Sequence, residues 1–248
     1  SGSNGGTVAD FNEDGFLDAA VTNWQAALVT VLFGDGTGAL SPDTVLTAGT
    51  RPQNVQVGDL NNDGSLDIAF AHGLSSFVTY YLGTGTKDFG PRVDVPATGD
   101  PGTGNVIIGD FNSDGFDDLA TLTIVGNTVS LNVMFWDDLT GEIDPTQHNS
   151  LTDGYSESIK AADFNMDGNL DVAASHRLQD KVSIYYGDGN GNLANKVDVP
   201  NIVAGSGPLA LAVDSFILPT PAETLQEVRD EISDIINTPP PPLSDQAI

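Results

Sequence analysis

A nine-residue pattern, Asp-x-Asn-x-Asp-Gly-x-x-Asp, occurs four times in this chain of 248 residues and limits what the chain can fold into. The copies begin at Asp10, Asp59, Asp110 and Asp163, so successive copies start 49, 51 and 53 residues apart. Asp214 follows after another 51 residues, in Leu-Ala-Val-Asp-Ser-Phe, but the rest of the pattern is missing there. Self-similarity at a nearly fixed spacing indicates tandem copies of one structural unit.

The residues around each nonapeptide indicate strands, because short alternating or apolar runs bounded by glycine are typical of strands. In the second copy they predict four strands, over residues 54–58, 67–71, 77–82 and 92–96. A glycine-rich turn separates the last two strands in three copies, at residues 34–38, 83–85 and 187–191. The third copy has residues 136–141 at this turn and no convincing fourth strand before Tyr155. Four strands in roughly 50 residues, repeated in tandem, are typical of β-propeller blades.

We therefore predict an all-β fold, a β-propeller of four-stranded blades with four repeats, a partial fifth repeat and a short C-terminal helix. The repeats are expected over residues 1–217, divided at about 1–50, 51–101, 102–154, 155–205 and 206–217. Residues 209–213 predict a strand that needs an edge to pair with, either in the first blade or in a neighbouring subunit. Residues 218–248 change to helical spacing, with a helix over 221–237 and then a Pro-rich tail.

The nonapeptide has the composition of a calcium loop. Calcium takes six to eight oxygen ligands, and short side chains at loop positions 1, 3 and 5 converge when a glycine at position 6 allows a sharp turn. Position 7 would add a backbone carbonyl, and the aspartate at position 9 would close the site. The sequence thus predicts about four calcium ions, held by Asp10, Asn12, Asp14, Phe16 and Asp18; by Asp59, Asn61, Asp63, Ser65 and Asp67; by Asp110, Asn112, Asp114, Phe116 and Asp118; and by Asp163, Asn165, Asp167, Asn169 and Asp171.

Three other interpretations of the loops are less favourable. An EF-hand requires a glutamate at position 12 and an exiting helix, whereas position 12 here is Val21, Phe70, Thr121 or Ala174, inside predicted strands. Magnesium keeps several waters and prefers strict octahedral geometry. A metal-free polar turn would explain one Asn-x-Asp-Gly sequence, but not the recurrence of the same ligand types in four copies.

The repeated loops, the Ala-containing strands after them and the Gly-Asp-Gly-x-Gly turns resemble the FG-GAP/VCBS repeats of integrin-type β-propellers. The resemblance covers about residues 7–217. It implies calcium-bearing blades in extracellular proteins, which serve in adhesion, in carbohydrate binding, or as modules attached to enzymes. It does not imply one function, because a fold supports many functions.

Composition excludes several classes of function. The chain has 35 acidic residues against 8 Lys and Arg, a formal net charge of −27. No cationic surface is available for phosphates, so nucleic-acid binding and attraction to anionic membranes are not expected. The sequence has no cysteine and no apolar run long enough to insert into a membrane. Of the acidic residues, 29 are Asp and 6 are Glu, which favours ligand carboxylates over a simply solvated surface.

Few residues outside the loops indicate chemistry. Trp24 and Trp136 fall at loop or turn positions, where an exposed aromatic ring would contact a ligand. His72 and His176 occupy one equivalent place near the end of the second strand of their repeats, which suggests either a further site or a strand end that meets solvent. No nucleophile, zinc-protease or P-loop pattern is present, so the chain is more readily an interaction module than an enzyme.

We expect a calcium-stabilised extracellular or cell-surface module, secreted, that binds a glycan or a protein without catalysis. Two other classes stay open. One is the propeller of a polysaccharide-active enzyme, which would show a deep cleft with convergent polar groups. The other is a structural subunit of an extracellular oligomer or filament, with the C-terminal strand and helix forming a homo-oligomer.

Overall fold

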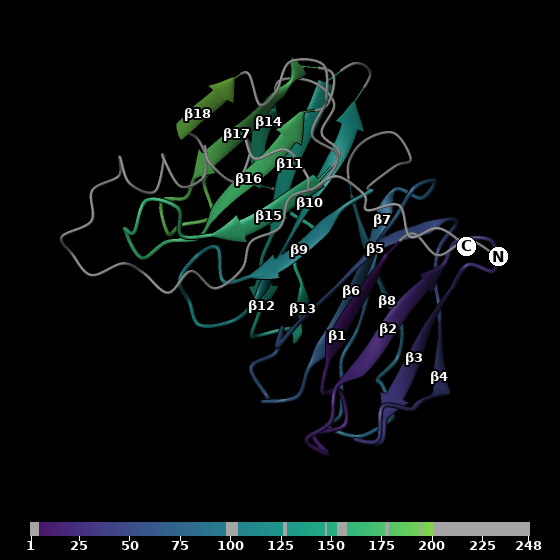
Figure 1. The fold of residues 1–248 in the computed structure, drawn as a ribbon. Coiled ribbons are helices and arrows are strands. Elements are labelled where there is room, and N and C mark those ends of the chain that lie inside the picture. The colour runs from purple at the N-terminus through teal and green to yellow at the C-terminus, as the bar shows by residue number, and fades with distance from the viewer. Residues whose placement is uncertain are drawn as a thin grey trace, which may run out of the picture. The chain divides into compact units, whose positions relative to one another are not determined.

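The computed structural model describes residues 5–97, 104–125, 128–146, 148–152, 158–176, 179–193 and 195–200. The chain divides into two compact units, Ser1–Ala212 and Val213–Ile248, and every described residue belongs to the first. This unit is all-β, as predicted, and its strands are antiparallel (Figure 1). The predicted strand 209–213, the partial fifth repeat and the helix 221–237 lie outside the described residues. No helix in the described part is long and apolar enough to cross a bilayer.

Each nonapeptide repeat forms one four-stranded sheet. The first sheet contains β1 (Gly6–Ala9), β2 (Asp18–Asn23), β3 (Leu28–Gly34) and β4 (Leu40–Thr47). The second contains β5 (Pro52–Gly58), β6 (Asp67–His72), β7 (Phe77–Tyr81) and β8 (Val93–Pro96). The third contains β9 (Val106–Gly109), β10 (Asp118–Val125), β11 (Thr128–Met134) and β14 (His148–Thr152). The fourth contains β15 (Ser158–Ala162), β16 (Asp171–His176), β17 (Lys181–Tyr186) and β18 (Asn195–Pro200).

The strands predicted for the second repeat are confirmed, with ends that differ by one or two residues. β5 begins at Pro52, before the predicted start at Asn54, and β6 extends to His72. In all four repeats the nonapeptide joins the first two strands and its last aspartate pairs at the root of the second strand, as Gly58 with Asp67 shows. The periodicity of the sequence therefore places the loops correctly in the fold.

The third repeat corrects one expectation, because it does contain a fourth strand. β14 pairs with β11, so that Asn132 lies opposite Asn149 and Leu131 opposite Ser150. A small hairpin of β12 (Trp136–Asp137) and β13 (Glu142–Ile143) comes before it and replaces the glycine-rich turn of the other repeats. This insertion moves the fourth strand away from its expected place and hides it from the periodic pattern.

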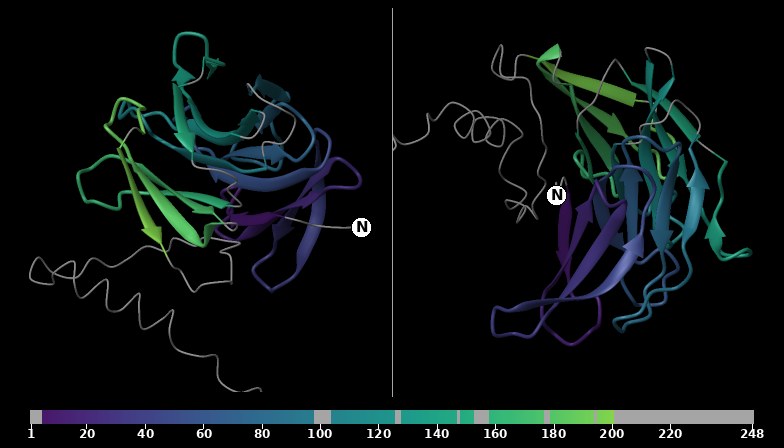
Figure 2. Two further views of the ribbon diagram at one scale, coloured as in Figure 1. Left: turned by 90° about the horizontal axis from the view of Figure 1, so that it is seen from above. Right: turned by 90° about the vertical axis from the view of Figure 1, so that its right-hand side faces the viewer.

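Apolar cores join the successive sheets. Alternate residues of a strand face opposite sides of its sheet, so β6 sends Ile68 and Phe70 into the core shared with the first sheet and Ala69 and Ala71 into the core shared with the third. A third core joins the third and fourth sheets and includes Leu131, Val172 and Tyr185. The first strands of successive sheets, β1, β5, β9 and β15, contact one another in chain order (Figure 2). The described residues thus form a series of blade-like sheets, and no closed ring is seen among them.

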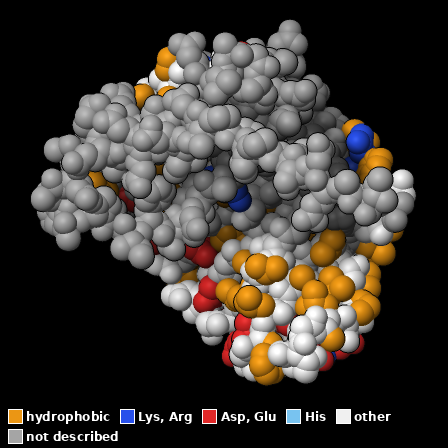
Figure 3. Space-filling view, in the orientation of Figure 1, with side chains coloured by type: hydrophobic (Ala, Val, Ile, Leu, Met, Phe, Trp, Pro, Cys, Tyr) orange, Lys and Arg blue, Asp and Glu red, His pale blue; other side chains and the backbone are white. Residues whose placement is uncertain are grey.

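The first sheet differs from the second because one of its faces is incompletely covered. β2 and β3 alternate between buried and partly exposed residues, whereas every residue of β6 and β16 is buried. Val8 and Val45 of this sheet are 65% and 56% exposed. Apolar side chains accordingly gather on the surface over β1–β4 (Figure 3). A strand that is covered on both faces is buried along its whole length. The alternation of buried and partly exposed residues in β2 and β3 therefore indicates that one face of this sheet is free.

Candidate functional site

The four nonapeptide loops share one backbone conformation. Position 4 has a positive φ in every copy although it is never glycine: 59° at Glu13, 53° at Asn62, 60° at Ser113 and 60° at Met166. Position 6 is always glycine, with φ between 86° at Gly15 and 94° at Gly115. Such φ values favour glycine, and a side chain adopts them only where the surrounding contacts hold the backbone. The repeated φ values show that the pattern dictates a specific turn.

Side chains at positions 1, 3 and 5 accept hydrogen bonds from backbone groups of their own loop. In the second repeat, the Asp59 carboxylate accepts from the Asp63 and Gly64 amides at 3.0 and 2.8 Å. Asn61 Oδ1 accepts from the Asp63 amide at 3.2 Å, and Asp63 Oδ1 accepts from the Ser65 amide at 2.8 Å. The same bonds recur in the other copies at 2.8 to 3.2 Å. Each loop therefore gathers three oxygen-bearing side chains around one turn.

The aspartate at position 9 has a different environment from the other three predicted side-chain ligands. Asp67 is buried, and its two carboxylate oxygens accept from the Leu60 amide at 2.7 Å and from the Gly83 amide at 2.7 Å. The other position-9 aspartates are also buried and bond equivalent amides, with Trp136 replacing the turn glycine in the third repeat; they are Asp18, Asp118 and Asp171. This carboxylate thus ties the nonapeptide loop to the turn after the third strand.

Burial raises the pKa of three of these carboxyl groups, those of Asp67, Asp118 and Asp171. The pKa of Asp67 rises to about 7, first because of desolvation and then because Asp63 and Asp59 repel its negative charge. The pKa of Asp118 also rises to about 7 for the same reasons, with Asp114 and Asp110 as the repelling groups. Backbone amides oppose both shifts. A cation beside such a loop would favour the ionised carboxylate.

The donor set fits calcium in kind. Every loop offers hard oxygen atoms from two carboxylates and one amide, and a carboxylate oxygen that accepts one N–H retains a lone pair for a metal. Position 7 lies in the same turn, at Phe16, Ser65, Phe116 and Asn169, where its carbonyl is the predicted ligand. In the described residues, no three acidic or histidine side chains converge on one point. The position-9 carboxylate is therefore not gathered with those of positions 1 and 5 into a preformed metal centre.

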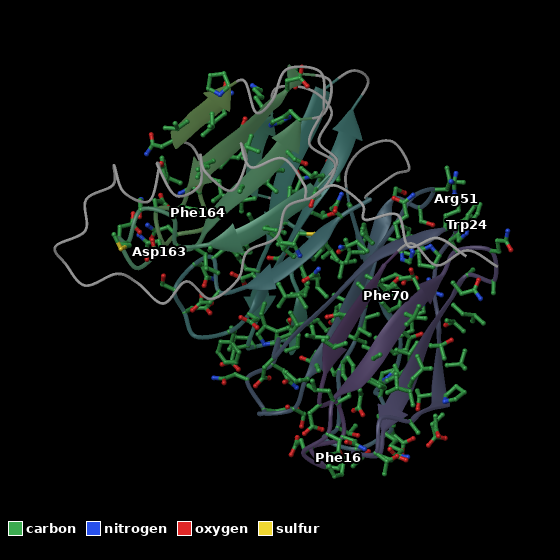
Figure 4. All side chains as sticks on the ribbon, viewed as in Figure 1. Phe16, Trp24, Arg51, Phe70, Asp163 and Phe164 are labelled. Carbon is green, nitrogen blue, oxygen red and sulfur yellow. The ribbon has the colours of Figure 1, made fainter. Side chains whose placement is uncertain are left out.

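The two tryptophans have different environments. Trp136 is only 6% exposed and packs edge-on against Tyr80 with ring centroids 6.4 Å apart. The expectation of an exposed ring at Trp136 is wrong, because the β12–β13 hairpin places it in the core between the second and third sheets. Trp24 is partly exposed in the turn between β2 and β3, and it lies at the end of the sheet away from Phe16 and its loop (Figure 4).

The two histidines are not strand ends that meet solvent, since His72 and His176 are fully buried. The His72 Nε2–H donates to Thr79 Oγ1 at 2.9 Å, and the Thr79 hydroxyl donates to Asp94 Oδ1 at 2.7 Å. The His72 ring also packs against the Phe77 ring, with centroids 5.0 Å apart. Both faces of β6 are covered, so the end of this strand is part of the core. The environment of His72 is that of a structural histidine.

His72 should make folding stability depend on pH. Burial, followed by the charge of Arg92, lowers the pKa of His72 to about 4, while Asp94 opposes the shift. The unfolded chain therefore binds the proton first, so stability is fully present above pH 6.5 and declines as the pH falls toward 4. We expect His72→Gln to remove about 2 to 3 kcal/mol of the loss between pH 7.5 and 4.5. Urea unfolding at both pH values measures it, and equal losses in both proteins would contradict it.

Two acidic residues of the loops were missed because they fall outside the repeated pattern. In the third repeat, position 8 is Asp117 where the other copies have leucine, and its carboxylate accepts from the Asp59 amide of the second loop at 3.1 Å. In the first repeat, Glu13 accepts from the Ser65 hydroxyl at 3.2 Å. Both contacts join neighbouring loops. The departure from leucine at position 8 was the only available signal in the sequence.

Comparison with known proteins relates the repeats to other chains. Residues 10–70 match the model of the FG-GAP-like repeat. No curated protein matches this sequence. A lectin of Agrocybe aegerita, described as specifically recognising non-reducing terminal N-acetylglucosamine, is 19% identical with a TM-score of 0.53, over 78% of this chain and 51% of the lectin. A putative 6-phosphogluconolactonase from Bacteroides uniformis is 12% identical with a TM-score of 0.57, over 80% of this chain and 55% of that protein.

The chain thus spans about half the length of each of these two structures, 51% and 55%. At these sequence identities the likeness concerns the fold alone. One neighbour is a lectin and the other a putative enzyme, so the comparison does not choose between binding and catalysis.

Proposed function

We propose, from the FG-GAP-like repeat over residues 10–70 and its three further copies, that this chain is a calcium-stabilised extracellular β-propeller module. It binds a glycan or protein at a surface and is not a catalyst. The observation that carries the proposal is the identical turn and hydrogen bonding of all four loops. The oxygens that recur at positions 1, 3 and 5 of every copy are also those that a calcium loop supplies.

Calcium would be held in each loop by the side chains of positions 1, 3 and 5 and by the carbonyl of position 7. The aspartate at position 9 would hold the loop in place through its hydrogen bonds to backbone amides. Asp59, Asn61, Asp63 and Ser65 form this set in the second repeat. The ion supplies neutralisation of carboxylates that otherwise repel one another, so its binding free energy becomes folding free energy. The bound ion would make each loop rigid and would fix the first two strands of each sheet where the loop joins them.

A closed ring is the arrangement that would cover the free apolar face of the first sheet. Val8 and Val45 are exposed there, while the corresponding faces of later sheets are packed against a preceding sheet. A further blade, whether from this chain or from another, would pack on that face in the same way. This supports a propeller as the working form.

Recognition is proposed at the end of the sheets opposite the calcium loops, where Trp24 is partly exposed. The lectin neighbour supports this choice, since it is an example of a similar fold that recognises a glycan. Catalysis is less favoured because the sequence carries no recognisable nucleophile pattern.

A binding assay tests the proposal. We expect wild-type protein to retain a glycan or cell-surface protein on an array or in a pull-down, and Trp24→Ala to lose at least about tenfold in affinity, as expected when a stacked aromatic contact is removed. Trp136→Phe should bind normally because Trp136 is buried. Calcium removal should weaken binding only as far as it unfolds the protein. Turnover of a polysaccharide, or binding indifferent to Trp24, would contradict the proposed role.

A further inference from the structure

Arg51 and Trp24 form an aromatic and cationic pair at the end of the first sheet. The Arg51 guanidinium carbon lies over the Trp24 ring, 5.0 Å from its centroid. Trp24 comes from the turn between β2 and β3, and Arg51 from the connection between β4 and β5 (Figure 4). Both residues are partly exposed. A cation–π contact therefore joins two segments far apart in the sequence and leaves part of both side chains open to solvent.

Arg51 has no anionic partner in the described part of the chain, although the protein is strongly acidic. Lys87 pairs with Asp43 and Arg92 with Asp94, while two lysines share Asp198. The Arg51 Nε atom, in contrast, is buried without a hydrogen-bond partner. Among the described residues, Arg51 thus differs from Lys87, Arg92, Lys181 and Lys196, each of which pairs with an aspartate. The guanidinium therefore carries a hydrogen-bond donor that no described group satisfies.

The backbone holds Arg51 in a strained conformation. Its φ is 61°, a value that favours glycine. The Arg51 carbonyl accepts from the Gly73 amide at 2.8 Å, and the Thr50 carbonyl accepts from the Leu74 amide at 3.3 Å, which ties this connection to the turn after β6. The Thr50 amide in turn donates to the Ser75 hydroxyl oxygen at 3.0 Å. These bonds fix the connection before any ligand arrives, so less entropy is lost when one binds.

We propose that Arg51 and Trp24 bind the carboxylate and the ring of a uronic acid residue at the end of a glycan. The proposal names the ligand class for the recognition proposed above and rests on it. The planar guanidinium matches a carboxylate through two parallel hydrogen bonds, and the indole edge and face contact the apolar side of a sugar ring.

The charge of the whole chain restricts this ligand to one carboxylate. A net charge of −27 repels a polyanion at every charged unit, and that repulsion grows along a sulfated or polyuronic chain. A single terminal uronate meets the same field with one charge only, while it gains the direct contact with Arg51. Few Lys or Arg side chains appear on the coloured surface in Figure 3. Arg51 is therefore a local positive site within an acidic surface.

A matched pair of sugars tests the proposal directly. Methyl β-glucuronide and methyl β-glucoside have the same ring and differ by the carboxylate, and acetate supplies a carboxylate without a ring. We expect calcium-loaded wild-type protein, titrated by tryptophan fluorescence or NMR, to bind the glucuronide at least about tenfold more tightly than the glucoside, as expected for a charge-assisted hydrogen bond. Acetate should bind more weakly than the glucuronide. Equal affinities for the two glycosides would overturn the proposal.

Variants separate the guanidinium from the fold. Arg51→Gly removes the side chain, and glycine suits the positive φ, so the protein should stay folded. The ratio of its affinities for the glucuronide and the glucoside should fall to about one. Arg51→Lys should keep only part of the preference, because an ammonium lacks the planar fork. Trp24→Ala should weaken both glycosides.

Lys87→Gln is the matched control, because Lys87 also lies over an aromatic ring, that of Phe33 at 5.0 Å, but already pairs with Asp43. It should bind like wild type. A preference retained in Arg51→Gly would overturn the proposal. If acetate and acidic peptides bind as tightly as the glucuronide, the partner is a protein carboxylate and the uronate is rejected. Either failure leaves calcium binding and Trp24-dependent recognition of another ligand intact, so it is distinguishable from failure of the proposed function.

Discussion

Excess EGTA is expected to lower the melting temperature of the calcium-loaded protein by at least about 10 °C. Each site stabilises the folded chain by about 2.7 kcal/mol when free calcium is 100 times its dissociation constant, and a protein of this size loses about 2 to 4 °C per kcal/mol. Four loops acting together therefore give a large shift. Chelation also leaves the carboxylates of each loop to repel one another. Calorimetry or circular dichroism with and without EGTA measures the change.

Asp63→Ala shows whether that shift comes from the loops. This variant should melt below wild type in calcium, and the two should melt at similar temperatures in EGTA, because Asp63 is exposed and its loss relieves repulsion. Asp138→Ala removes an exposed aspartate from the β12–β13 hairpin and serves as the control, with no expected change in either condition. Superimposable melting curves for wild type with and without EGTA would mean that the loops do not stabilise the fold through calcium.

Asp67→Ala is expected to cost about 3 to 5 kcal/mol of unfolding free energy whether calcium is present or not. Its carboxylate is fully buried and accepts from the Leu60 and Gly83 amides at 2.7 Å each. The substitution leaves two buried N–H groups without an acceptor. Denaturant unfolding in calcium and in EGTA measures the loss. Asp67→Asn, which keeps one acceptor oxygen, should lose less.

The contrast between Asp63 and Asp67 separates two roles that look alike in the sequence. If Asp67→Ala destabilised the protein only in calcium, its carboxylate would be mainly a metal ligand. If it destabilised in both conditions, the carboxylate mainly joins the loop to the turn after β7. The hydrogen bonds favour the second result.

The repeat in the sequence was enough to predict the strands and the loops, because a fixed spacing of turn residues and alternating apolar residues has few structural solutions. The environment of position 9 could not be predicted in the same way. The donors to Asp67 are backbone amides, which every residue other than proline possesses, and one of them, Gly83, lies 16 residues away. Only the pairing of the strands brings that amide to the carboxylate.

The other corrections have similar causes. The β12–β13 hairpin interrupts the spacing of the third repeat, so neither the burial of Trp136 nor the strand β14 follows from the pattern. His72 lies at the end of its strand, and its burial depends on Phe70 and Phe77 and on the sheets that cover both faces. No sequence motif marks Arg51, because what distinguishes it is its contact with Trp24 and the lack of an anionic partner among the described residues.

The number of calcium ions bound per chain tests the central claim most directly. Protein dialysed against calcium and then against metal-free buffer, and measured by elemental analysis, should hold about four ions, one for each Asp-x-Asn-x-Asp-Gly-x-x-Asp loop. Asp63→Ala should hold about one fewer, because one loop loses a ligand. A value near zero for the wild type would contradict the account.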